Sequence, residues 1–234
     1  MNVAAPPIPI GLERERFYVW EVPVRIAHWL IFFSIIVLAA TGIYIGHPLF
    51  SVPGAARDHF VTGYFKVVHF YAAIVFTLAV LSRVAWMFMG NEYSRWNQFV
   101  PITAERRRNL RRTLAFYSFI RRDPPAAVGH NALAGMTYCV VFGLYFMMIA
   151  TGFALYSAGA ALDSPMRYFR FLIPLLGGLQ NARWIHHVGM WLIVAFMIHH
   201  VYSVLLMSEI EATGLTESIV SGNKFINPEH PVRE

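Results

Sequence analysis

The sequence predicts an all-α membrane protein, a bundle of four transmembrane helices with both termini in the cytoplasm. Hydrophobic residues make up 57% of the 234 residues and charged residues only 14%, whereas a water-soluble domain carries about 25% charged residues. Four apolar stretches are each long enough to cross a bilayer, which takes about 20 residues in a helix. We therefore treat residues 1–234 as a single membrane domain.

The four helices are expected over about 26–46, 67–88, 131–156 and 184–207. The first and third lie in stretches without any Asp, Glu, Lys or Arg, and the second contains only Arg83. None of the four alternates apolar with polar residues as the strand of a membrane barrel would. Because residues 1–25 are polar and mixed in charge, we expect no signal peptide before the first helix.

Basic residues set the expected orientation. The segment of about 89–130, between the second and third helices, is rich in arginine: Arg95, Arg106, Arg107, Arg108, Arg111, Arg112, Arg121 and Arg122. Three more arginines precede the first helix: Arg14, Arg16 and Arg25. The other two connections carry few basic residues. Cytoplasmic loops of membrane proteins are enriched in Lys and Arg. A basic loop beside a helix end sets topology or contacts anionic lipid, so we expect membrane lipid, and no nucleic acid, as its partner.

Cysteine usage narrows the chemistry of the chain. Cys139 is its single cysteine. A disulfide framework, a zinc finger and an iron–sulfur cluster held by this chain alone are therefore excluded.

Histidine is the candidate functional residue, because ionisable groups inside a membrane span mark functional sites. In the fourth helix His186 and His200 return to within about 40° of one face, and about 21 Å of helix separates them. His187 and His199 point elsewhere on the same helical wheel. Two imidazoles this far apart cannot bind one metal ion, but each can bind its own cofactor.

Depth in the membrane matches each of these histidines with a partner. The first helix starts inside, so His28 is level with His200; the second starts outside, so His69 is level with His186. Two bis-histidine sites follow, an inner and an outer one. Two neutral imidazoles suit the iron of a low-spin haem. Since no Cys-x-x-Cys-His is present, we expect two non-covalent haem b groups, with these four histidines as metal ligands.

Two further polar residues lie near the expected inner site. Arg83 follows His69 by fourteen residues and could bind a haem propionate, or extend to the membrane surface instead. His130, at the start of the third helix, could hydrogen-bond a quinone, or merely cap that helix.

Small residues also recur near the expected outer site. Gly42 and Gly189 could each let a porphyrin lie against the backbone, or serve close helix packing instead. The tripeptide Ala40-Thr41-Gly42 is repeated as Ala150-Thr151-Gly152, a weak internal echo.

Several motifs in order resemble the b-type cytochrome subunit of membrane-bound uptake NiFe-hydrogenases. The resemblance covers about residues 18–223 and rests on these stretches: Val22-Pro23-Val24-Arg25-Ile26-Ala27-His28-Trp29, Val68-His69-Phe70, Gly129-His130-Asn131, Thr151-Gly152-Phe153-Ala154-Leu155-Tyr156, His186-His187-Val188-Gly189-Met190-Trp191, His200-Val201-Tyr202 and Ser221-Gly222. It implies a four-helix dihaem anchor whose ligand positions fall on His28, His69, His186 and His200. His187 is a local difference, which leaves open which of the adjacent histidines is the outer ligand.

The resemblance also implies a function. A hydrogenase of small and large subunits on the periplasmic face of the bacterial inner membrane would oxidise hydrogen. Electrons would pass through the outer and then the inner haem to a quinone near the cytoplasm. The chain itself would hold no hydrogenase active site, since a NiFe centre needs several cysteine thiolates. Residues 158–183 are the expected docking surface, with an ordinary membrane-surface loop as the competing interpretation.

Two other functions stay open from the sequence. A cytochrome b subunit of formate dehydrogenase or thiosulfate reductase would keep the haems and change the partner. A transporter could use the histidines as a proton or metal relay instead.

Overall fold

The computed structural model describes residues 14–49, 59–122 and 128–226. Four helices in it are long and apolar enough to cross a membrane: α1 (Val22–Gly46), α2 (Val61–Met89), α4 (Ala132–Ala158) and α6 (Leu179–Glu211). They coincide with the four helices predicted from the sequence and extend most of them by a few residues. The fold class, an all-α membrane protein with four spanning helices, is confirmed.

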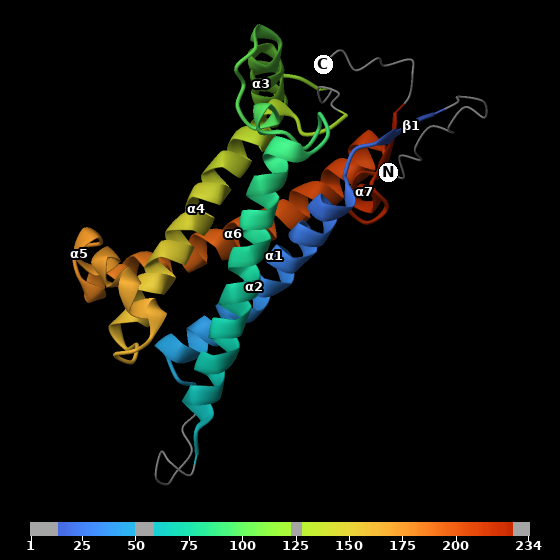
Figure 1. The fold of residues 1–234 in the computed structure, drawn as a ribbon. Helices are drawn as coiled ribbons and strands as arrows, with labels where there is room; N and C mark the ends of the chain where they lie inside the picture. Colours follow the sequence, from blue (N-terminus) through green and yellow to red (C-terminus); the bar gives the residue numbers. More distant parts are fainter. Residues whose placement is uncertain (1–13, 50–58, 123–127, 227–234) are drawn as a thin grey trace.

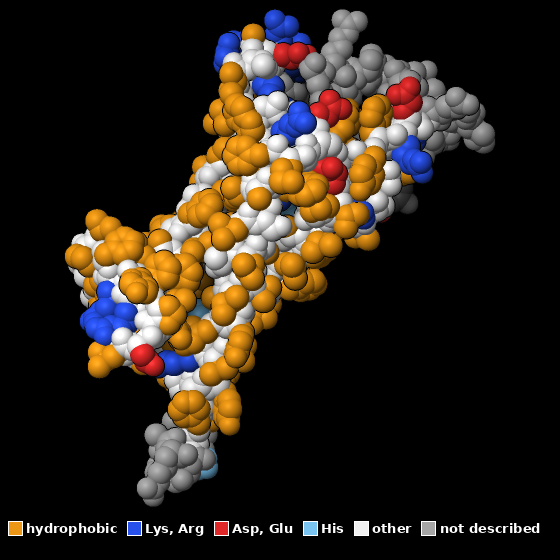
Figure 2. Space-filling model, viewed as in Figure 1, with side chains coloured by type: hydrophobic (Ala, Val, Ile, Leu, Met, Phe, Trp, Pro, Cys, Tyr) orange, Lys and Arg blue, Asp and Glu red, His pale blue; other side chains and the backbone are white. Residues whose placement is uncertain are grey.

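The four long helices form two antiparallel hairpins. Helix α1 packs mainly against α2, and α4 packs mainly against α6 (Figure 1). A central cluster of buried side chains joins the hairpins, with members from all four helices: Ile31, Ile35, Phe76, Ala79, Val80, Val141, Tyr145 and Ile193. Hydrophobic side chains also cover the long outer surface, while charged ones gather toward its two ends (Figure 2). This pattern fits a protein that lipid surrounds.

The arginine-rich segment is more ordered than a simple loop. The sequence predicts a connection over about 89–130, yet this segment contains the 3-10 helix η1 (Trp96–Gln98) and the helix α3 (Ala104–Tyr117). The Thr103 hydroxyl caps α3 by accepting a hydrogen bond from the backbone N–H of Arg106. Apolar periodicity could not reveal this helix, because so many of its residues are arginine.

A small sheet, which is not among the elements predicted from the sequence, joins the two ends of the described chain. Strand β1 (Glu15–Tyr18) pairs antiparallel with β2 (Asn223–Ile226), which follows the short helix α7 (Leu215–Ser221). Figure 1 shows this sheet, α7 and α3 at one end of the bundle. At the opposite end lie η2 (Pro165–Phe171) and α5 (Leu172–Leu175).

Glu21, just before α1, fastens the first hairpin at the end that holds the sheet. Its carboxylate accepts a hydrogen bond from the Trp86 indole N–H and another from the backbone N–H of Asn91, both at 2.8 Å. Trp86 lies in the last turn of α2 and Asn91 just beyond it. One acidic side chain therefore ties the beginning of α1 to the end of α2.

Substitution of Glu21 should loosen this end of the bundle. Glu21→Ala removes a charged acceptor from two donors, and we expect a loss of about 2 kcal/mol in the free energy of unfolding. Glu21→Gln keeps one acceptor oxygen and should lose less. Thermal unfolding of the detergent-solubilised protein measures both; equal midpoints for Glu21→Ala and the wild type would contradict the interpretation.

Candidate functional site: two histidine pairs

The structure brings together the two pairs of histidines that are predicted to lie at equal depths in the membrane. The imidazole rings of His28 on α1 and His200 on α6 have centroids 6.3 Å apart and planes inclined by 54°. The rings of His69 on α2 and His186 on α6 have centroids 6.5 Å apart and planes inclined by 60°. In both pairs one histidine comes from each hairpin. Helix α6 thus contributes to both sites, about 21 Å apart along its axis.

His187 points away from the outer pair. Its Nδ1 hydrogen-bonds the carbonyl oxygen of Arg183, one turn earlier in α6, at 2.8 Å. The other side of the ring lies against Gly46 of α1, where a Cβ would come within 2.7 Å of Nε2. Of the two adjacent histidines, His186 is therefore the one that faces His69.

Two threonines that are not among the predicted site residues hold the outer histidines. The Thr41 hydroxyl lies 2.8 Å from Nδ1 of His69, and the Thr151 hydroxyl lies 2.8 Å from Nδ1 of His186. Both threonines are buried. They are the central residues of the repeated Ala-Thr-Gly tripeptide, so that echo was the signal that could have found them.

The glycines near the site divide between two roles. A Cβ on Gly42 would lie 3.4 Å from Cε1 of His69, and a Cβ on Gly152 would lie 3.6 Å from Cε1 of His186. Each of these two glycines therefore lies directly against an outer imidazole. Gly189 instead faces α4, where a Cβ would come within 2.6 Å of the Met147 methyl group. For Gly189, close helix packing is the better interpretation.

An apolar layer separates the two histidine pairs. The buried cluster of the bundle centre is drawn from residues between the pairs along each long helix. Within it the rings of Phe76 and Tyr145 meet edge to face, with centroids 5.1 Å apart. The two pairs are thus separate sites with buried, mainly apolar side chains between them.

His130 lies beside the inner pair but does not cap α4. That role belongs to Asn131, whose side chain accepts a hydrogen bond from the backbone N–H of Ala134. The His130 ring contacts the rings of Trp20 and Tyr138, each at a centroid distance of 4.6 Å. Tyr138 in turn lies 6.5 Å from the His200 ring. Nδ1 of His130 is buried without a hydrogen-bond partner among the described residues.

Basic side chains surround His130. Arg83 is buried rather than extended to the membrane surface: its guanidinium donates to the Ser94 carbonyl at 3.4 Å and lies 5.5 Å above the Phe99 ring. Burial of the imidazole lowers the pKa of His130 well below its ordinary value, and the charges of Arg83, Lys224 and Arg106 and the neighbouring His200 lower it further. His130 is therefore neutral at physiological pH, in a basic environment that favours an anionic group.

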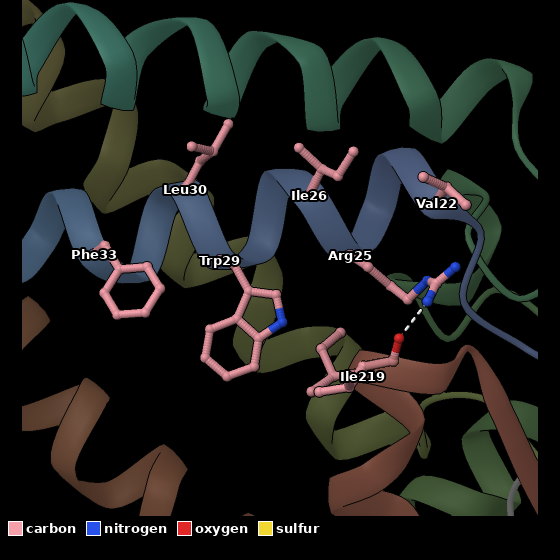
Figure 3. A pocket seen from close by; sticks show the side chains of 8 residues that line it. Val22, Arg25, Ile26, Trp29, Leu30, Phe33 and Ile219 are labelled. Carbon is pink, nitrogen blue, oxygen red and sulfur yellow. Dashed lines mark hydrogen bonds between the residues drawn. The ribbon is translucent and has the colours of Figure 1, made fainter.

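A hollow of about 490 Å³ lies on the outside of α1, near the end of the bundle that holds α7 and the sheet (Figure 3). Helices α1 and α7 line it with apolar side chains and one charged residue, Arg25: Val22, Arg25, Ile26, Trp29, Leu30, Phe33, Ile219 and Val220. Arg25 donates to the Val220 carbonyl, which bridges the two helices. The lining suits a hydrocarbon chain better than a polar ligand.

Comparison with known proteins shows the family of the chain. The family model described as prokaryotic cytochrome b561 matches residues 19–222, nearly the whole described chain. The chain belongs to this family. Three similar relatives have almost the same name. Two are each called "Probable Ni/Fe-hydrogenase B-type cytochrome subunit", and the third is called "Probable Ni/Fe-hydrogenase 1 B-type cytochrome subunit". They come from Cupriavidus necator (40% identical, covering 91% of this chain and 88% of the relative), Bradyrhizobium diazoefficiens (38%; 92% and 88%) and Escherichia coli K12 (39%; 88% and 89%). The resemblance noted from the motifs is confirmed.

A prokaryotic cytochrome b561 is a b-type cytochrome, and the two histidine pairs of this chain fit haem. With about 2 Å from metal to imidazole nitrogen and about 1.1 Å from that nitrogen to the ring centre, two imidazoles that hold one metal ion between them would have centroids about 6.2 Å apart. The observed 6.3 and 6.5 Å agree with this value. The described residues contain no group of three or more His, Cys, Asp or Glu side chains able to hold a metal ion. Two protein ligands per iron suit a porphyrin, which supplies the rest.

The environment of His130 predicts a pH effect with a definite sign. The native protein holds the pKa of His130 down, whereas the unfolded chain has the ordinary value of about 6.5. The unfolded state therefore binds more protons below that pH, and this contribution to stability falls as the pH drops from 7 to 5. Nitrogen NMR of histidine-labelled protein should show a neutral His130 at pH 6. An imidazolium signal that His130→Gln removes would contradict this.

Proposed function

We propose that this chain is a dihaem cytochrome b anchor that passes electrons from a periplasmic NiFe-hydrogenase to the quinone pool. The observation that carries the proposal is the presence of two histidine pairs at two depths, each with the ring separation of bis-imidazole haem ligands. Two sites separated across the membrane suit electron transfer through it. A single site would suit only a local reaction.

The protein's part in this function is to bind, orient and insulate. His69 and His186 would hold the outer haem, and His28 and His200 the inner one. Haem, when bound, supplies one-electron iron chemistry. The apolar layer around Phe76 and Tyr145 keeps water away from the region between the pairs. With one cysteine the chain holds no NiFe centre, so hydrogen oxidation belongs to the partner.

The orientation follows from charge. The end with the sheet, α7 and α3 carries most of the arginines and would face the cytoplasm, with both termini, at the bacterial inner membrane. The opposite end, including η2 and α5, would then face the periplasm. There Leu162, Tyr168 and Leu175 are 85%, 83% and 74% exposed, close to Arg167 and Arg170. This surface is our candidate for docking the hydrogenase small and large subunits, and the names of the relatives support that choice of partner.

Quinone reduction would take place beside the inner pair. Within the described part of the chain Nδ1 of His130 has no hydrogen-bond partner, and the Tyr138 ring lies between the rings of His130 and His200 in a series of contacts. Its neutral imidazole can hydrogen-bond a quinone carbonyl. The buried guanidinium of Arg83 can stabilise negative charge, either that of a reduced quinone or that of a haem propionate.

Haem content provides the first test of the proposal. A pyridine haemochrome assay on the purified protein should find two haem b per chain. We expect His69→Ala and His186→Ala to lose one haem each, since each removes an axial ligand. The matched control is His187→Ala, which should retain both. A colourless wild-type protein would instead favour the histidine relay of a transporter.

Co-purification provides the second test. The tagged chain, isolated from its own membranes in mild detergent, should bring down a NiFe-hydrogenase and support hydrogen-dependent quinone reduction. Recovery of a formate dehydrogenase instead would leave the proposed haem binding intact and contradict the proposed partner.

Substitution of His130 separates quinone reduction from haem reduction. In His130→Phe we expect roughly tenfold slower hydrogen-dependent quinone reduction, about the effect of one lost hydrogen bond. Hydrogen should still reduce both haems, because the haem ligands are untouched. His130→Gln keeps a side-chain donor and should retain more activity. Unchanged quinone reduction in His130→Phe would place the quinone elsewhere.

A further inference from the structure

The two histidine pairs differ in what holds their imidazoles. Both outer rings meet a threonine hydroxyl at 2.8 Å, Thr41 at His69 and Thr151 at His186. Each contact lies within one hairpin: α1 to α2 in the first, α4 to α6 in the second. The outer site is therefore built from two equivalent halves, each a threonine and a histidine on neighbouring helices.

The hydrogen bonds of the threonines favour one direction for these contacts. The Thr41 hydroxyl lies 2.7 Å from the Val37 carbonyl oxygen, and the Thr151 hydroxyl lies 2.8 Å from the Met147 carbonyl oxygen. Since a hydroxyl has one proton, it can bond both the carbonyl and the imidazole only if it donates to the carbonyl and accepts from Nδ1–H. In that tautomer Nδ1 of His69 and of His186 carries its proton, which leaves the Nε2 lone pair free for a metal.

Among the residues that the structure describes, no hydroxyl hydrogen-bonds the inner pair in this way. Nδ1 of His28 is buried without a hydrogen-bond partner among the described residues. The His200 ring stacks on Phe196 of its own helix, with centroids 5.6 Å apart and planes inclined by 21°. Hydrocarbon and aromatic contacts thus take the place that a polar acceptor has at the outer pair.

We infer that Thr41 and Thr151 are positioning residues that lower the reduction potential of the outer haem relative to the inner one. The inference rests on the proposed function. An acceptor at Nδ1–H makes the imidazole a stronger donor to the metal. Stronger donation stabilises Fe(III) over Fe(II), and hydrogen bonding around the ligands is one of the means by which proteins set haem potentials.

The asymmetry gives electron flow a direction. With haem held by both pairs, transfer of one electron inward would oxidise an outer Fe(II) to Fe(III) and reduce an inner Fe(III) to Fe(II). With the lower potential outside, this transfer is favourable toward the side where the quinone would be reduced. The threonines act only through the histidines, so they contact neither iron nor quinone.

A redox titration of hydroxyl-deleted variants tests the inference. Thr151→Val and Thr41→Val keep the side-chain volume and remove the acceptor. We expect the outer midpoint potential to rise and the inner one to stay fixed, shifting the electron distribution between the haems about tenfold toward the outer site, which is 59 mV for one electron. The midpoint missing from His186→Ala identifies the outer haem.

Matched variants separate this effect from general disturbance. Thr151→Ser and Thr41→Ser restore the hydroxyl and should restore the potential. Thr77→Val removes a hydroxyl that makes the same bond to its own helix, at 2.7 Å to the Ala73 carbonyl, and should change neither midpoint.

The haem content of each variant is measured beside its potentials. If two haems are retained and both midpoints are unchanged in Thr41→Val and Thr151→Val, the inference is wrong and the proposed function stands. The inference is equally wrong if Thr77→Val or the serine variants raise the outer midpoint as much. A wild-type protein without two haems overturns both. Electron paramagnetic resonance of the oxidised protein gives an independent readout, since the g values of the outer haem alone should move.

Discussion

An imidazole in the hydrocarbon region has no water to hydrogen-bond, so each one must find a partner in the protein or a ligand. Helix α6 places two such imidazoles, His186 and His200, about 21 Å apart on nearly one face. The second histidine of each pair comes from the opposite hairpin, His69 from α2 and His28 from α1. The relative placement of the two hairpins is therefore tied to the sites themselves. The apolar cluster between the pairs then completes a bundle whose outside can be left to lipid.

Much of this arrangement could be predicted from the sequence. Helix length and apolarity are direct requirements of the bilayer, and all four spans were found. The matching of His28 with His200 and of His69 with His186 needed only helical periodicity and alternating chain direction. Whether these side chains ligate haem stays a prediction, although the ring distances support it.

The features that sequence reasoning missed depend on contacts between distant segments. Strands β1 and β2 are four residues each and lie at opposite ends of the chain, so no local sequence pattern predicts their pairing. Helix α3 contains so many arginines that it lacks the apolar periodicity by which a helix is predicted. Thr41 and Thr151 are ordinary helix residues until the structure places a histidine beside each. Their shared tripeptide was visible, but only the neighbouring helix gives it a physical meaning.

The spacing of the two pairs along α6 has an energetic consequence. About 21 Å is some 70% of a 30 Å hydrocarbon core. In the proposed orientation an electron that moves inward travels toward the negative side of an energised membrane. At 100 mV this costs about 1.6 kcal/mol per electron, from roughly 2.3 kcal/mol for a full crossing. The transmembrane voltage would thus oppose each inward step, and a cell with a strong voltage would hold electrons back at the outer site.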